Sequence, residues 1–159
     1  AKARGAEVMI TDLVDARLER AKDMGADIAL NTQQNDLKEA VMAFTDGEGM
    51  PVIVDTICQP WSLELAVALT CPAGRVVTLG TNNKPSTIAQ MDITKKELDI
   101  LGSRLSNYRF PEVIELFEAG KLTPEKMRTS VFHFTDAEKA IKQALEHPET
   151  ECKVTLSFD

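Results

Sequence analysis

The segment Glu7-Val-Met-Ile-Thr-Asp12-Leu-Val-Asp15-Ala-Arg17 carries the clearest structural signal in the chain. Its first five residues are mostly apolar and lack polar alternation, which predicts a strand covered on both faces over Glu7–Thr11. Asp12 follows directly, and Arg17 stands five positions later, inside a predicted helix. The segment therefore predicts a buried strand that ends in an acidic side chain and turns into a helix.

An acidic residue at the end of such a strand has a defined chemical use. In a dinucleotide-binding sheet, the carboxylate accepts hydrogen bonds from both adenosine ribose hydroxyls and repels a 2′-phosphate, which selects NAD over NADP. Arg17 would then reach the same ribose. Two alternatives stay open: Asp12 only caps the helix while Arg17 forms a surface ion pair, or the acid holds a ribose as in methyltransferases.

The same strand-then-helix pattern continues along the chain. Further strands are predicted at Asp27–Leu30, Pro51–Asp55, Arg75–Leu79, Leu98–Leu101, Ser130–Phe134 and Lys153–Phe158. Apolar residues recur with helical spacing over 37–44, 110–117 and 137–145, and Thr135-Asp-Ala-Glu138 predicts a capping box. Segment Thr81–Thr94 is predicted to be irregular. Strands that alternate with helices indicate βαβ units, and hence an α/β fold with a parallel sheet.

Three more predicted strands end in residues that suit a ligand. They end in Asp55-Thr56-Ile57, in Leu79-Gly80-Thr81 and in Gly102-Ser103-Arg104-Leu105. Open α/β sheets bind ligands outside the carboxyl ends of their strands. A glycine there also lets a flat ligand approach the backbone. The ordered series indicates a binding edge.

Composition restricts the function classes. The chain has 159 residues, 27% charged, with net charge -7, and the length fits one domain. This charge repels phosphate backbones and anionic lipid, so nucleic acid and membrane partners are not expected. No apolar run approaches the roughly 20 residues of a membrane span, and no signal peptide opens the chain, which favours the cytoplasm.

The chain has three cysteines, Cys58, Cys71 and Cys152, and they form no CxxC pair. We therefore expect reduced thiols, and we expect no metal site.

The order of these segments resembles the zinc-type, medium-chain alcohol and polyol dehydrogenase family over nearly the whole chain. The resemblance rests on Asp12 to Asp27, on Pro72-Ala-Gly-Arg-Val-Val-Thr-Leu-Gly80, on Lys96 to Ser103 and on Phe134 to Phe158. Gly102 to Pro111 is most similar to the sorbitol-like branch, which acts on polyols and sugar acids. The resemblance implies a Rossmann-like, doubly wound parallel sheet.

Residue roles follow from the resemblance. Asp12 and Arg17 would hold the adenosine ribose of NAD, and Thr56 and Ile57 would line the path of the adenosine and the nicotinamide ribose. The nicotinamide carboxamide would be held by the carbonyls of Leu79 and Ser103 and by the amide of Leu105, beside Gly80 and Thr81. Lys153 would face the pyrophosphate, although a solvated charge beside a strand explains it equally well.

The sequence departs from the family in what it lacks. The family's first strand and GxGxxG turn would lie before Ala1, and its catalytic zinc domain is absent. Residues 1–159 are therefore expected to form a partial dinucleotide-binding domain. The chain opens as the last turn of a helix closed by Gly5, which suggests a fragment. No catalytic or metal-binding residue is assigned, and His133 is interpreted as structural.

The resemblance implies a parent enzyme that uses NAD to oxidise a secondary alcohol, with zinc from the absent domain and a homodimeric or homotetrameric assembly. One alternative is a zinc-free, quinone reductase-like NADPH oxidoreductase, which Asp12 disfavours. Another is a non-catalytic dimerisation module that pairs through Leu98–Leu101. Loss of the first strand also exposes the edges of Glu7–Thr11 and Pro51–Asp55. We expect these edges to be closed by direct pairing, by a swapped segment or by a neighbouring chain.

Overall fold

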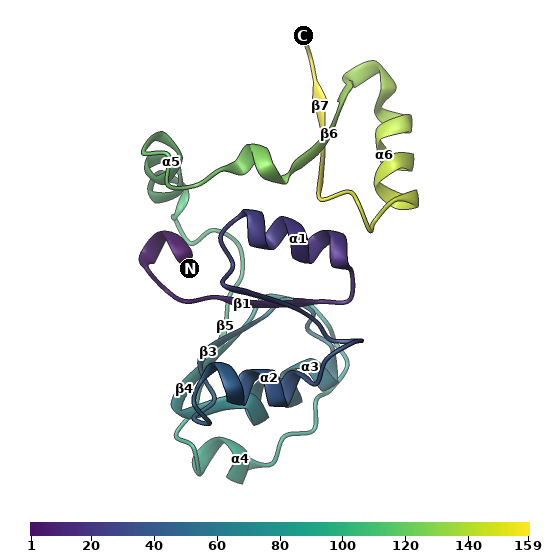
Figure 1. Cartoon of the computed structure of the whole chain (residues 1–159). Coiled ribbons are helices and arrows are strands. Elements are labelled where there is room, and N and C mark those ends of the chain that lie inside the picture. The colour runs from purple at the N-terminus through teal and green to yellow at the C-terminus, as the bar shows by residue number, and fades with distance from the viewer. The chain divides into compact units, whose positions relative to one another are not determined.

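The computed structural model describes all 159 residues, which form two compact units. The first unit combines Ala1–Asn35 with Tyr108–Asp159, and the second consists of Asp36–Asn107. Figure 1 labels most of their helices and strands. Each unit is described separately below. None of the helices has the length and apolar character needed to cross a bilayer.

The amino-terminal part of the first unit is one βαβ element. Its parts are β1 (Met9–Asp12), α1 (Asp15–Asp23) and β2 (Ile28–Asn31), preceded by a 3-10 turn at Lys2–Arg4. The two strands are parallel and pair Met9 with Ile28 and Asp12 with Asn31. Leu18 is the buried residue of α1. Lys2 Nζ lies 2.8 Å from both carboxylate oxygens of Asp27, and this hydrogen bond lowers the pKa of Asp27.

The carboxyl-terminal part of the first unit ends in a second βαβ element. This part of the chain begins with α5 (Phe110–Glu118) and a 3-10 turn at Pro124–Met127. The βαβ element follows and consists of β6 (Arg128–His133), a 3-10 turn at Phe134–Asp136, α6 (Ala137–Glu146) and β7 (Lys153–Ser157). The strands β6 and β7 are parallel, and α6 lies beside them (Figure 1). Ala140 is the buried residue of α6.

Glu151 joins the α6–β7 loop to its neighbours. Its Oε1 accepts hydrogen bonds from Ser130 Oγ at 2.8 Å and from Gln143 Nε2 at 2.9 Å, and Oε2 accepts one from Thr129 Oγ1. These hydrogen bonds lower the pKa of Glu151, and the bond from Thr129 has the largest effect. One carboxylate thus holds β6, α6 and the start of β7 together.

The second unit is a three-stranded parallel sheet with helices. Its elements are α2 (Leu37–Phe44), β3 (Met50–Asp55), α3 (Pro60–Leu69), β4 (Thr70–Thr78), α4 (Gln90–Thr94) and β5 (Asp99–Gly102). The strand order is β3-β4-β5, with β4 in the centre. Val76 of β4 is fully buried and packs with the core residues Ala66, Val67 and Leu98. The apolar run in β4 therefore forms the centre of this unit.

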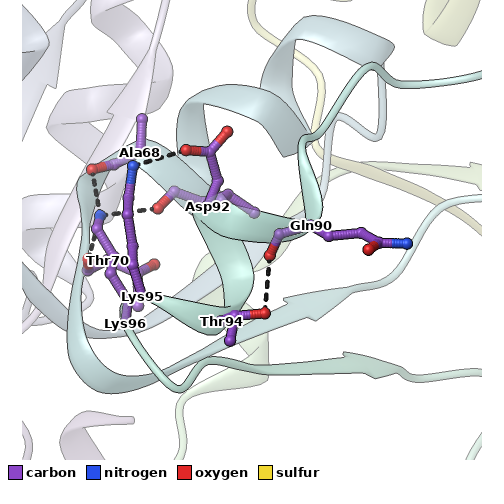
Figure 2. A network of polar contacts seen from close by, with 8 residues as sticks. Ala68, Thr70, Gln90, Asp92, Thr94, Lys95 and Lys96 are labelled. Atoms are coloured by element: carbon purple, nitrogen blue, oxygen red, sulfur yellow. Dashed lines mark hydrogen bonds and ion pairs between the residues drawn. The ribbon is translucent and has the colours of Figure 1, made fainter.

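Lys96 closes the carboxyl end of α3. Figure 2 shows the ammonium group of Lys96 between the carbonyl oxygens of Ala68 and Thr70. Its Nζ donates to each of these oxygens at 2.8 Å and to the carbonyl oxygen of Val67 at 3.1 Å. Helix carboxyl ends leave carbonyls without partners, and a cation there also meets the negative end of the helix dipole. Burial lowers the pKa of Lys96. The neighbouring Lys95 instead pairs with Asp92 at 2.6 Å and lowers the pKa of that carboxyl.

The predicted elements agree with the structure in most places. All seven predicted strands form, although β4 begins at Thr70, five residues before the expected Arg75. The expected cover on both faces is wrong for several of them, since Ile10 of β1, Val54 of β3 and Val131 of β6 are 40%, 53% and 53% exposed. Segment Thr81–Thr94 was expected to be irregular, but it contains α4 at its end because Ile93 packs against the core. The chain therefore has the α/β fold with parallel sheets that its sequence predicts.

One further expectation was wrong. The capping box at Thr135–Glu138 does not form: Thr135 Oγ1 lies 2.7 Å from His133 Nδ1, and Asp136 pairs with Lys139, which lowers the pKa of Asp136. A 3-10 turn precedes α6 and takes up the residues that would have capped it. Of the three closures expected for the exposed strand edges, direct pairing is not formed, because β1 and β3 belong to separate sheets. A swapped segment and a neighbouring chain stay predictions.

Candidate functional site

Asp12 ends β1, as predicted, and its two carboxylate oxygens have different surroundings. Oδ1 accepts hydrogen bonds from the amides of Leu13 at 2.8 Å and Val14 at 3.0 Å, which shapes the turn into α1. Oδ2 lies 3.6 Å from Nη1 of Arg17, an ion-pair distance rather than a hydrogen bond. The side chain is 30% exposed. Oδ2 therefore retains the capacity to accept a hydrogen bond from a ligand.

Arg17 has a partner that the sequence did not indicate. Its Nη2 donates to the carbonyl oxygen of Pro148 at 2.5 Å, in the loop between α6 and β7. Arg20, one turn further along α1, donates to the carbonyl oxygen of Thr150 at 2.8 Å. Both arginines thus hold this loop, and the guanidinium of Arg17 contacts Asp12 and the loop at once.

Asp55 organises the end of β3, a role that sequence reasoning missed. The residue is 6% exposed. Its Oδ1 accepts from the amides of Ile57 and Cys58 at 3.0 and 2.9 Å, and its Oδ2 accepts from Ser62 Oγ at 2.8 Å. A buried carboxylate needs such partners. These bonds fix the loop that carries Thr56 and Ile57, both of which are exposed. The signal available in the sequence was an acidic residue at the end of an apolar run.

The ends of β4 and β5 lie at the same edge of the sheet. The amide of Leu79 donates to the carbonyl of Asp55 at 3.0 Å, and the amide of Ser103 donates to the carbonyl of Thr78 at 2.9 Å. Because all three strands are parallel, their carboxyl ends meet there. The structure thus brings the predicted residues Thr56, Ile57, Leu79, Gly80 and Ser103 to one edge of the second unit.

Two further predicted residues extend from this edge. Thr81 follows Gly80 in the irregular segment and is exposed. Leu105 is 90% exposed and has a φ of 58°, in the left-handed region that side chains rarely adopt. Its side chain therefore makes no contribution to the core.

Lys153 is placed apart from Asp12. It is the first residue of β7, is exposed and pairs in register with Arg128 of β6. Asp12 instead lies at the carboxyl end of β1, in the sheet formed with β2. The structure therefore does not join the two residues in one sheet, and the ordinary interpretation of Lys153 as a solvated charge fits its position.

The chain offers no evident metal site. No group of three or more His, Cys, Asp or Glu side chains lies close enough together to hold an ion, and all three cysteines are free. His133 is used locally: its Nδ1 lies 2.7 Å from Thr135 Oγ1, and its ring packs against Phe134 with centroids 4.6 Å apart. These residues therefore offer no ligand set for the zinc that the resemblance assigns to another domain.

Comparison with known proteins adds independent observations. Residues 1–119 match the family model described as zinc-binding dehydrogenase. The starvation-sensing protein RspB of Escherichia coli K12 is 41% identical over 152 residues, which are 95% of this chain and 44% of that protein. The sorbitol dehydrogenase of Bacillus subtilis 168 is 29% identical in an alignment of 160 residues, which covers 99% of this chain and 45% of that protein.

A solved structure of a dehydrogenase has a similar fold. The crystal structure of the short-chain alcohol dehydrogenase RspB from Escherichia coli CFT073, complexed with NADH, matches with a TM-score of 0.88 and 40% identity. The match covers 96% of this chain and 44% of that one. The chain thus spans less than half the length of these relatives. Because the family model covers most of its residues, the chain belongs to the zinc-binding dehydrogenase family.

Proposed function

We propose that this chain is the cofactor-binding part of an NAD-dependent, zinc-type dehydrogenase that oxidises a secondary alcohol of a polyol or sugar acid. The observation that carries the proposal is Asp12, which ends a parallel strand with Oδ2 free to accept a hydrogen bond. Similarity to a sorbitol dehydrogenase and to an NADH-bound alcohol dehydrogenase supports the substrate and cofactor classes. Location in the cytoplasm and a homodimeric or homotetrameric assembly are part of the proposal.

In the first unit, Asp12 is proposed to accept hydrogen bonds from the adenosine ribose. Its negative charge opposes a 2′-phosphate, so NAD is preferred over NADP. The quinone reductase-like alternative, which uses NADPH, would require a cation at this position. Arg17 stays part of the proposed ribose site, with the Pro148 contact as its anchor, and Lys153 is retained as a candidate for the pyrophosphate.

In the second unit, the strand ends are proposed to hold the nicotinamide part of the cofactor. The carbonyls of Leu79 and Ser103 and the amide of Leu105 would bind the carboxamide, which fixes the ring face presented for hydride transfer. Thr56 and Ile57 would line the path of the ribose. Gly80 and Thr81 would border the ring, and the glycine leaves room for it.

Zinc has no ligand set among these residues, so its ligands are proposed to come from another part of the protein. When bound, zinc polarises an alcohol and lowers its pKa. The 159-residue chain by itself is therefore expected to catalyse no turnover. An absorbance assay of NADH formation with a panel of polyols and sugar acids checks this, and steady NADH production by this chain would refute it.

Cofactor binding is tested by ligand-observed NMR, which detects weak complexes. The chain lacks the glycine-rich turn that supplies donors to a pyrophosphate, so weak binding of NAD⁺ is expected. Signals of NAD⁺ should show saturation transfer from the protein, and those of NADP⁺ should show less. Equal transfer to both coenzymes, or transfer to neither, would contradict the proposed role of Asp12.

A non-catalytic dimerisation module is the second candidate. Strand β5 is an edge strand, and its residues Ile100 and Leu101 are 37% and 45% exposed. An exposed apolar edge favours pairing with another chain. Light scattering that finds only a monomer, together with NAD⁺ binding, would favour the cofactor-binding function over this one.

A further inference from the structure

Cys58 joins the ends of two strands in the second unit. Its thiol donates to the carbonyl oxygen of Asp55 at 3.1 Å, and its Sγ accepts a hydrogen bond from the amide of Gly80 at 2.8 Å. The first contact is with the end of β3, and the second is with the residue that follows Leu79 beyond β4. One side chain thus links both loops of the proposed nicotinamide edge.

The backbone at both residues is adapted to this contact. Cys58 has a φ of 51°, which residues with a side chain rarely adopt, and its amide is held by Asp55 Oδ1 at 2.9 Å. A Cβ at Gly80 would lie 2.2 Å from Cβ and 2.6 Å from Sγ of Cys58. The thiol therefore fills the space that a side chain at Gly80 would need, and the contact requires both residues.

We infer that Cys58 is a positioning residue for the nicotinamide end of the cofactor. The inference rests on the proposed function, which assigns Leu79, Gly80 and Thr81 to that end. The thiol holds the amide of Gly80, and this sets the orientation of the adjoining Leu79 carbonyl, which is the proposed acceptor for the carboxamide. The amide of Gly80 already donates to the Cys58 thiol. The neighbouring backbone therefore contacts the ligand, and Gly80 N does not.

The inference is tested by comparing two ligands on the 159-residue chain. NAD⁺ carries nicotinamide, whereas ADP-ribose lacks it but retains the adenosine, the pyrophosphate and the second ribose. Dissociation constants are measured by NMR chemical-shift titration for the unsubstituted chain, Cys58→Ala and Cys58→Ser. Loss of the thiol should weaken NAD⁺ binding about three- to ten-fold, the effect of losing one neutral hydrogen bond, and leave ADP-ribose binding unchanged.

Serine retains a donor and an acceptor at the same place, so Cys58→Ser should recover most of the NAD⁺ affinity. Cys152→Ser is the matched control, because Cys152 is an exposed thiol in the first unit and should affect neither ligand. Equal weakening of both ligands by Cys58→Ala would show a merely structural role and overturn the inference, as would unchanged binding of both. Failure of the unsubstituted chain to bind either ligand would instead overturn the proposed function itself.

Discussion

Ser62 Oγ lies 2.8 Å from Oδ2 of Asp55, and both residues are buried, with exposed fractions of 8% and 6%. The hydroxyl is also within 2.8 Å of the carbonyl of Gln59 and accepts from the Gln59 amide at 2.9 Å. A helix start and a strand end are thus held by the same hydroxyl. The hydrogen-bonded loop between β3 and α3, which bears Thr56 and Ile57, depends on this pair.

Ser62→Ala should destabilise the chain by about 1–3 kcal/mol, because it leaves a buried carboxylate oxygen without its partner. Urea unfolding followed by circular dichroism measures the change. Ser86→Ala, in the irregular segment of the same unit, is the control and should have a much smaller effect. Equal effects of the two substitutions would show that the Asp55 contact contributes little.

Lys96→Met should lower the free energy of unfolding by about 1 kcal/mol, because the carbonyls at the end of α3 lose a cationic donor. Lys95→Met is the matched control, since Lys95 forms an i,i+3 pair with Asp92 in which both side chains are well exposed. Chemical denaturation of the two variants under the same conditions gives the comparison. A larger loss in Lys95→Met would contradict the capping role of Lys96.

Glu151 should contribute to the pH dependence of stability. Its pKa is lowered in the folded state from an ordinary value of 4.5, so its contribution is present above that value and is lost as pH falls through the folded-state pKa. Glu151→Gln should therefore show a shallower decrease in stability with acidification. Urea midpoints measured from neutral pH to about pH 2 test this. Glu118→Gln, at the end of α5, should retain the slope of the unsubstituted chain, and an unchanged slope in Glu151→Gln would refute the prediction.

Gly80→Ala should destabilise the second unit by about 1–3 kcal/mol, because the new Cβ collides with Cys58. Adding Cys58→Gly removes the colliding atoms and also relieves the positive φ at that position, so the double variant should be more stable than Gly80→Ala alone. A double-mutant cycle from thermal unfolding measures the coupling. Strictly additive effects would mean that the two residues do not share this space.

Asp12→Asn tests the proposed coenzyme preference. Asparagine keeps the oxygen that accepts from Leu13 and Val14 but removes the negative charge. NAD⁺ binding should weaken about ten-fold or more, as expected for a lost charged hydrogen bond, and the discrimination against NADP⁺ should decrease. NMR titrations with both coenzymes provide the measurement. Asp23→Asn, at the end of α1, should change neither affinity, and an Asp12→Asn chain that still discriminates fully would exclude Asp12 as the selector.

Much of the fold was accessible from the sequence because local patterns report local structure. Runs of apolar residues marked every strand, and the periods of 110–117 and 137–145 marked α5 and α6. The capping box failed because its residues also suit a 3-10 turn, and His133 and Lys139 supplied competing partners. Helix α4 was missed because its five residues are too few for a helical period to be evident.

The sequence alone determined the alternation of parallel strands and helices and put Asp12 at the end of its strand, because both follow from the apolar pattern of neighbouring residues. Tertiary structure alone decided the partners: Pro148 for Arg17, Gly80 for Cys58 and Ser130 for Glu151. A hydrogen bond requires two atoms within about 3 Å. Which distant backbone or side-chain atom reaches that distance depends on how the elements pack, which no short stretch of sequence specifies.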